Sequence, residues 1–132
     1  MIENIATLIE PKQEDKGIEE LCILEINNQR LQVFDSWGNM HPLYFGKKYK
    51  VELILVQLDY EEPEIQNFDH NEAKQIGSTF FYDLYGRVEN GIFIVGNFKF
   101  EWEDFEDDPM YENKFVKLHV DRIIVDFLEE LD

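Results

Sequence analysis

The strongest structural signal in the chain is an alternation of apolar and polar residues on both sides of Asn90-Gly91. Apolar side chains recur at every second position in Thr79–Glu89 and again in Ile92–Glu103, which is the period of a β-strand with one buried face. Asn-Gly favours a tight hairpin turn, because the turn needs residues that adopt positive φ. The stretch therefore predicts an antiparallel β-hairpin, and other strands must cover its apolar face.

The length of this turn decides which residues of the two arms face each other, because the apolar residues of both arms fall mostly on even positions. A two-residue turn would pair Val88 with Phe93 and put the two apolar sets on opposite faces. A three-residue loop, residues 89–91, would pair Val88 with Ile92 and keep them on one face. A two-residue turn followed by a bulge at Gly96-Asn97 is the alternative. We expect the three-residue loop, because it requires only one special residue.

The chain before this hairpin predicts a helix and a second hairpin. Apolar residues recur at helical spacing ahead of Pro11, which predicts a short N-terminal amphipathic helix carrying Ile2, Ile5, Leu8 and Ile9. Ile18–Ile26 and Arg30–Asp35 read as strands joined by a turn at residues 27–29. The following loop, residues 36–48, contains large apolar side chains that we expect to fold back onto the core: Trp37, Met40, Tyr44 and Phe45.

Two later segments shift their apolar phase, and each shift predicts a bulge or a bend. Tyr49–Tyr60 changes from odd to even positions at Val56, and Phe115–Phe127 changes after residues 121–122. Between these segments, Asn71–Ile76 predicts a short helix. The acidic end of the chain, residues 128–132, is expected to fray.

Together these elements predict a mostly β, antiparallel fold of about six strands with the short N-terminal helix. The chain has 132 residues, of which 44% are hydrophobic, so residues 1–132 are expected to form a single domain with a core of its own. Two strands with internal bends favour a small, partly open barrel, of the shape of an oligonucleotide-binding (OB) barrel, and a sandwich is the other arrangement compatible with the pattern.

The net charge of −17 restricts the classes of partner more than any motif does. It arises from 29 acidic and 12 basic residues. Such a field repels phosphate backbones, which argues against direct binding of nucleic acid, and it accelerates encounter with a basic protein. The alternative is that the acidic residues serve only solubility.

An acidic, aromatic-rich segment follows the hairpin and is the candidate binding site. Residues 101–112 include seven acidic residues and no Lys or Arg, and the second acidic stretch, Asp59–Glu72, has six acidic residues and again no Lys or Arg. Protein interfaces combine a few aromatic anchors with a polar rim. We expect Phe105 or Tyr111 to anchor a partner, whereas Trp102 continues the apolar phase of the core. The predicted partner-binding residues are Glu101, Glu103, Asp104, Phe105, Glu106, Asp107, Asp108, Tyr111 and Glu112.

Signals for catalysis and for metal binding are weak. The three histidines lie far apart in the sequence without zinc-ligand spacing, and the single cysteine, Cys22, sits in an apolar run typical of a core strand. Lys117, His119 and Asp121 alternate on one strand and would form a polar row, which reads more simply as a solvated strand face than as a catalytic site. We therefore expect a non-enzymatic protein without a cofactor or metal.

The expected compartment is the cytoplasm. The N-terminus lacks the basic and apolar regions of a signal peptide, and no apolar run is long enough to span a membrane. The sequence thus predicts an acidic, protein-binding inhibitor or immunity protein that blocks a basic, nucleic-acid-handling partner such as a nuclease toxin. In size and charge the chain is similar to bacterial immunity proteins and DNA-mimic inhibitors, a likeness of composition only. The alternative function is a structural or adaptor module of a larger assembly.

Overall fold

The computed structural model describes residues 2–12, 20–35, 44, 46–77 and 80–131. The expected mostly β fold is confirmed, but the expected number of strands is too low. The elements in chain order are β1 (Asn4–Lys12), β2 (Glu20–Ile26), β3 (Gln29–Asp35), β4 (Lys48–Val56), β5 (Glu64–Ile65), β6 (Glu72–Gln75), β7 (Tyr82–Glu89), β8 (Ile92–Val95), β9 (Phe98–Glu101), α1 (Glu103–Asp107), the 3₁₀ helix η1 (Pro109–Tyr111), β10 (Phe115–Val120) and β11 (Arg122–Leu131).

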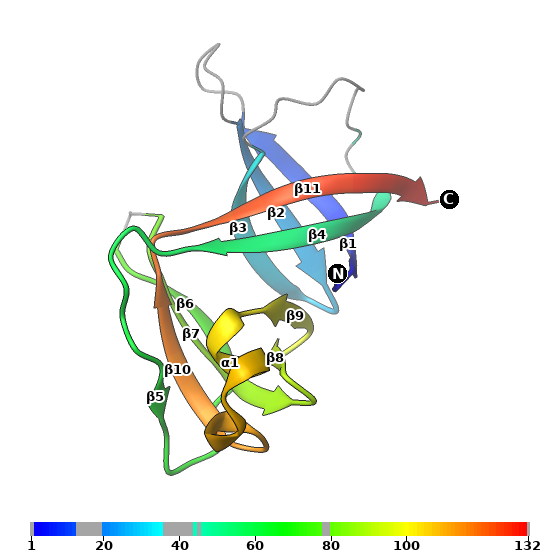
Figure 1. Ribbon diagram of the computed structural model, residues 1–132. Helices are drawn as coiled ribbons and strands as arrows, with labels where there is room; N and C mark the ends of the chain where they lie inside the picture. The colour runs from blue at the N-terminus through cyan, green and yellow to red at the C-terminus, as the bar shows by residue number, and fades with distance from the viewer. Residues whose placement is uncertain (1, 13–19, 36–43, 45, 78–79, 132) are drawn as a thin grey trace.

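Five strands form a closed barrel in the order β1-β2-β3-β11-β4, and β1 pairs with β4 to close it (Figure 1). Neighbouring strands are antiparallel except β3 and β11, which run parallel where Phe34 faces Ile124. Alternate residues point inward, so that Leu24, Leu31 and Val51 are completely buried. The expected barrel character is thus confirmed, but this barrel is closed where a partly open one was expected.

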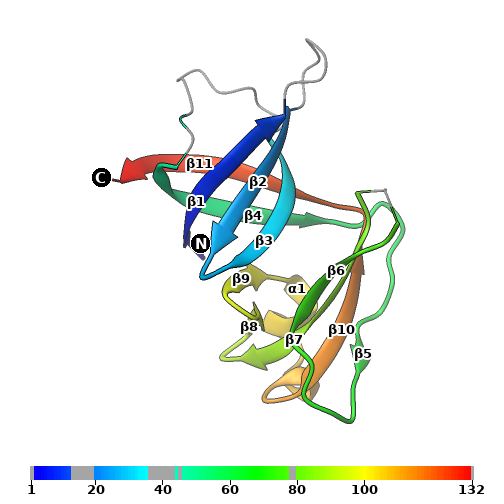
Figure 2. The same cartoon turned by 180° about the vertical axis from the view of Figure 1, so that it is seen from behind.

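A second sheet is inserted between β4 and β11 and lies beside the barrel (Figure 2). Its strand order is β5-β10-β7-β8-β9, and β6 also pairs with β7. The chain returns to the barrel at Asp121, the one residue between β10 and β11. The apolar phase shift after Asp121 therefore marks a change of sheet, and the single bent strand expected over residues 115–127 is two strands.

The hairpin at Asn90-Gly91 has a two-residue turn, so the expected three-residue loop is wrong. Both turn residues have positive φ, 54° and 76°, and Val88 pairs with Phe93 without a bulge. The strand after the turn consequently buries its odd residues, Phe93 and Val95. The pairing of β7 with β8 therefore follows from a two-residue turn, which was the first part of the alternative that placed a bulge at Gly96-Asn97.

The even phase returns through a second hairpin. Gly96-Asn97 forms a turn between β8 and β9, where the alternative placed a bulge, and Gly96 has a φ of 60°. This turn restores burial to the even positions Phe98 and Phe100. The expected long second arm is therefore two short strands.

The expected N-terminal helix is also wrong, because these residues form β1. Ala6 and Leu8 are buried while Ile5 is 55% exposed, which is the period of a strand. The pairing of β1 with β2 shifts between Leu8 and Glu10, and this irregularity alters the spacing of the apolar residues. Backbone pairing on both sides of β1 outweighs the local helical pattern.

Three smaller expectations change as well. The predicted helix at residues 71–76 is strand β6, because its backbone pairs with β7. The segment expected to continue as a strand to Tyr60 ends at Val56, and Leu58 and Tyr60 are 78% and 67% exposed. The end expected to fray is paired, since β11 runs to Leu131 opposite β4. Of the loop expected to cover the core, residues 36–43 and 45 lie outside the described residues, and Tyr44 is exposed.

Two carboxamide side chains of the barrel bond the backbone of the second sheet. Asn4, which is 5% exposed, donates to the carbonyl of Lys99 (2.8 Å) and accepts from the N–H of Lys99 (2.9 Å). Gln29 donates to the carbonyl of Val95 (3.3 Å) and accepts from the N–H of Asn97 (2.7 Å). Each carboxamide supplies one donor and one acceptor, so these backbone groups obtain from a side chain the hydrogen bonds that a neighbouring strand would otherwise supply.

Candidate functional site

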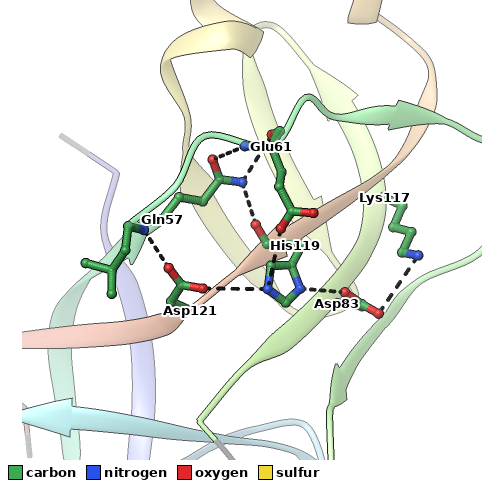
Figure 3. Close-up of polar contacts among 7 residues, drawn as sticks. Gln57, Glu61, Asp83, Lys117, His119 and Asp121 are labelled. Atoms are coloured by element: carbon green, nitrogen blue, oxygen red, sulfur yellow. Dashed lines mark hydrogen bonds and ion pairs between the residues drawn. The ribbon is translucent and has the colours of Figure 1, made fainter.

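The connector between β4 and β5, residues 57–63, is held against the second sheet by hydrogen bonds. Gln57 Nε2 donates to the carbonyls of His119 (2.6 Å) and Glu61 (3.2 Å), and Gln57 Oε1 accepts from the N–H of Glu61 (3.1 Å). The N–H of Leu58 donates to the Asp121 carboxylate. These bonds, most of which are drawn in Figure 3, give the connector a defined shape although it has no strand pairing.

His119 on β10 is the centre of a polar cluster beneath this connector (Figure 3). Its Nδ1 lies 3.0 Å from a carboxylate oxygen of Asp83 on β7, and its Nε2 lies 3.6 Å from carboxylate oxygens of both Glu61 and Asp121. Lys117 Nζ lies 3.9 Å from the other Asp83 oxygen. The cluster thus contains the polar row expected on this strand and adds two carboxylates from other elements.

The chemistry of this cluster is charge pairing across elements. Lys117 pairs with Asp83, and the imidazole of His119 lies between the carboxylates of Asp83 and Asp121. His119 also packs against Phe81, with ring centroids 5.7 Å apart. Such compensation fits a joint between the sheet, the connector and β11. The expected solvated strand face is therefore only partly right, because His119 and Asp121 are 23% and 18% exposed and lie within this cluster.

A hydrogen bond joins the two acidic stretches of the sequence. The hydroxyl of Tyr60, in the connector, donates to Asp104 Oδ2 of α1 at 2.8 Å. Residues 59–62 and 103–108 therefore lie on neighbouring parts of the molecule. We call the carboxylates on the two sides of this bond the acidic surface: Asp59, Glu61, Glu62, Glu103, Asp104, Glu106, Asp107 and Asp108.

Electrostatic effects on two tyrosines show that carboxylates of both stretches act at the same place. The hydrogen bond to Asp104, followed by desolvation and by the negative charges of Asp104 and Glu62, raises the pKa of Tyr60 to about 12. Desolvation, followed by the charges of Glu62, Asp104 and Asp108, raises the pKa of Tyr111. Both hydroxyls are therefore held in the protonated, hydrogen-bond-donating form.

The aromatic anchors expected in the acidic segment are not accessible to a partner. Phe105 and Tyr111 are 3% and 4% exposed. The Phe105 ring packs against Phe93, with centroids 5.0 Å apart, and against Tyr111 at 5.3 Å. Both residues therefore stabilise the packing of α1 and η1 on the second sheet. Trp102, expected in the core, is half-buried against it.

Other apolar side chains are exposed beside the carboxylates instead. Leu58 and Tyr60 of the connector are 78% and 67% exposed, and Met110 of η1 is 50% exposed. Leu58 and Tyr60 continue the apolar alternation that begins at Val56, and this alternation predicted a strand up to Tyr60. Three acidic residues and Pro63 within residues 59–63 were the signal that the strand had ended.

Several of the predicted carboxylates have structural roles. Glu112 accepts hydrogen bonds from the N–H groups of Asn90 (2.6 Å) and Gly91 (3.0 Å), so it supports the β7–β8 turn. Asp108 accepts from the N–H of Met110 (3.0 Å) and caps η1. These two residues are therefore committed to local structure.

Three of the other predicted carboxylates, all on α1, are more open to a partner. Glu103, Glu106 and Asp107 are exposed on α1, and in the described part of the chain no Lys, Arg or His forms an ion pair with them. Glu101 is exposed on β9. A shallow hollow of about 410 Å³ lies beside Glu106 and is lined by Asn90, Gly91, Phe105, Glu106, Pro109 and Glu112.

Two further properties concern the described residues only. Among them, no group of three or more His, Cys, Asp or Glu is placed to hold a metal ion. No helix formed by these residues has the length and apolar character needed to cross a membrane.

Comparisons with known proteins assign the chain to a family without adding a related structure. Neither the curated proteins nor the solved structures give a match. A family model matches residues 5–128, from β1 through the second sheet and into β11. The chain therefore belongs to the family described as Uncharacterised conserved protein UCP019853.

Proposed function

We propose that the protein binds a basic protein through the acidic surface and thereby inhibits it, in the manner of an immunity protein against a nuclease toxin. The observation that carries the proposal is the hydrogen bond between Tyr60 and Asp104, because it brings both acidic stretches together around an exposed aromatic ring. The carboxylates would occupy the positions that phosphates take in the partner's nucleic-acid groove. The protein acts without catalysing a reaction.

Charge and exposure support this function. The net charge of −17 accelerates encounter with a basic partner. Stable contact needs apolar anchors in addition to charge, and Leu58, Tyr60 and Met110 supply exposed apolar area beside the carboxylates. The connector that carries Leu58 and Tyr60 is fixed at its start, because Gln57 donates to the His119 carbonyl and the N–H of Leu58 donates to the Asp121 carboxylate. Little conformational entropy is therefore lost when a partner binds.

The position of the acidic surface in the fold gives a second argument. We infer that the barrel is OB-like, since it is a five-stranded, mostly antiparallel barrel whose fourth and fifth strands in chain order are β4 and β11. OB barrels bind nucleic acid partly through the connection between these two strands. In this chain the same connection carries Asp59–Glu62 and α1. A connection with this negative charge suits the binding of a partner protein whose own surface is basic because it binds nucleic acid.

A pull-down from host lysate with a charge-matched pair of variants tests the proposal. The first variant, Glu106→Lys with Asp107→Lys, reverses two carboxylates of the acidic surface. The control, Glu52→Lys with Asp126→Lys, reverses two carboxylates that face each other on β4 and β11 of the barrel. Both variants have the same net charge, so only the place of the change differs.

The proposed function predicts that the wild type and the control retain a basic nucleic-acid-binding protein, that the first variant loses it, and that high salt releases it. The purified pair should then show inhibition of the partner's nucleic-acid binding or cleavage. Capture of a neutral partner that resists high salt, equally by both variants, would instead favour the adaptor module and contradict the inhibitor.

A further inference from the structure

The ring of Tyr60 is the exposed aromatic group at the centre of the acidic surface. It is 67% exposed, and its hydroxyl is fixed by Asp104 at 2.8 Å. Within the described residues, no aromatic ring and no cation stacks on it. The ring is therefore held in one place with its face open to a partner.

Other rings of the described chain are covered by cations of the same chain. The pairs are Arg87 over Phe115 (5.6 Å), Lys117 over Tyr85 (6.0 Å) and Arg122 over Phe34 (5.2 Å). Tyr60 differs because its hydroxyl bonds a carboxylate, that of Asp104, and because a second carboxylate, that of Glu62, follows two residues later in the same connector. In the part of the chain that the structure describes, neither carboxylate forms an ion pair. Ring and carboxylates together form a place for a cation that none of the described residues supplies.

The chemistry of this place distinguishes between the two common cationic side chains. A guanidinium is planar and weakly hydrated, so it stacks on an aromatic face while its N–H groups bond a carboxylate. An ammonium group is strongly hydrated and acts as a point charge, which the carboxylates attract without the same use of the ring. Asp104 gives one oxygen to the Tyr60 hydroxyl and keeps the other for such a donor.

We propose that Tyr60, Glu62 and Asp104 form a docking surface for an arginine side chain of the partner. This inference rests on the proposed function and narrows it, since the basic partner must present an exposed arginine where it meets the connector. The carboxylates supply attraction for any cation, and the ring supplies the preference for arginine over lysine.

The test uses peptides in place of the unidentified partner. The ¹⁵N-labelled full chain is titrated at low salt with two short peptides that alternate glycine with arginine or with lysine, and with a neutral citrulline peptide of the same length. The amide shifts of residues 57–62 and 103–108 report binding at this surface. We expect saturable shifts with both cationic peptides, an affinity about two- to fivefold higher for the arginine peptide, and no binding of the citrulline peptide.

Three variants assign the preference to the ring. Tyr60→Leu should bind both cationic peptides with equal affinity, because it removes the ring at an exposed position. Tyr60→Phe should keep the preference for arginine, because the face of the ring is retained. Tyr44→Leu is the matched control, since Tyr44 is the other exposed tyrosine, 52% exposed, and should keep the preference.

The outcomes separate this inference from the proposed function. Equal affinity of the wild type for the two cationic peptides, or a preference that survives in Tyr60→Leu, overturns the arginine docking surface and leaves binding through the carboxylates intact. Binding of neither cationic peptide to the acidic surface contradicts the proposed function as well.

Discussion

At the scale of single residues, the hydroxyl of Tyr60 couples the connector to α1 through its proton. The bond to Asp104 requires the protonated phenol as donor, so the bond is lost when Tyr60 ionises. The folded-state pKa, about 12, is higher than the ordinary value of 10.0. The stabilisation of the folded state by this hydrogen bond is therefore complete below pH 10, and it is lost as the pH rises through the folded-state pKa of Tyr60.

Replacing Asp104 by Asn should lower the pKa of Tyr60 toward 10, because the charged acceptor is removed. Ultraviolet titration should show tyrosine ionisation of Asp104→Asn at lower pH than in the wild type, chiefly that of Tyr60, and to a smaller extent that of Tyr111, whose pKa the charge of Asp104 also raises. Asp107→Asn is the control, since Asp107 lies on the same helix and makes no bond to Tyr60. Superimposable curves for wild type and Asp104→Asn would show that this bond does not hold the proton.

Gly86 on β7 is required by the close approach of a neighbouring strand. A Cβ atom added there would lie 2.1 Å from the carbonyl oxygen of Ile94. Gly86→Ala should destabilise the protein by about 2 kcal/mol or more, because the backbone of β8 must move. Urea unfolding measures this loss.

Gly46→Asn is the control for Gly86. No atom lies within 4 Å of a Cβ added at Gly46, and Asn tolerates the φ of 76° at this position. The unfolding midpoint of Gly46→Asn should therefore stay near that of the wild type.

At the scale of elements, the β7–β8 turn depends on a side chain far along the chain. Glu112 accepts from two N–H groups of the Asn90-Gly91 turn. Glu112→Ala should lower the free energy of unfolding by about 1–3 kcal/mol, because hydrogen bonds to a charged acceptor are lost. Glu112→Gln should lose less, since its amide oxygen is retained.

The matched control for Glu112 is Glu106→Ala. Glu106 lines the same hollow, is exposed, and forms no ion pair in the described part of the chain. Its removal should change the unfolding midpoint little. If both variants unfold at the same urea concentration, Glu112 does not support the turn and belongs with the carboxylates open to a partner.

Strands that follow from local alternation were predictable, and choices that depend on long-range pairing were not. The hairpin of β2 and β3 and the phase shift after Asp121 are visible in the sequence. The helical spacing before Pro11 misled because β1 obtains its hydrogen bonds from two distant strands. The Asn90-Gly91 turn was misjudged because a second turn at Gly96-Asn97 restores the register that the first turn reverses.

For the candidate site, the sequence predicts where the negative charge is concentrated, but it does not predict which side chains lie next to each other. The sequence locates both acidic stretches, but the Tyr60–Asp104 bond that joins them links residues 44 positions apart. Whether an aromatic residue in an acidic run faces the core depends on packing, so Phe105, expected to be an exposed anchor, is buried, and Tyr60, expected in a strand, is exposed. A carboxylate that supports a turn, such as Glu112, looks the same in sequence as one that is free to bind.

At the scale of the whole molecule, the barrel and the second sheet are joined through buried polar groups. Asn4→Asp should destabilise the protein by about 1–3 kcal/mol, because the carboxylate cannot donate to the Lys99 carbonyl and is buried beside it. The carboxylate can still accept from the N–H of Lys99, but the weakened joint should open more often, so hydrogen exchange of the Lys99 amide should become faster. Asn113→Asp, at an exposed turn, is the control and should leave both quantities unchanged. Protection of Lys99 that persists in Asn4→Asp would place the joint elsewhere.

The pairing of Val56 with Arg122 has a consequence for how this architecture can change in evolution. The two residues flank the whole insertion, residues 57–121, and face each other on adjacent barrel strands. Because its entry and exit points are neighbours, a segment of a different length can take the place of this one without altering the barrel register, at an entropic cost that grows only slowly with length. The part of the chain that carries the acidic surface is therefore the part most easily exchanged, and its surface can diverge while the barrel is inherited unchanged.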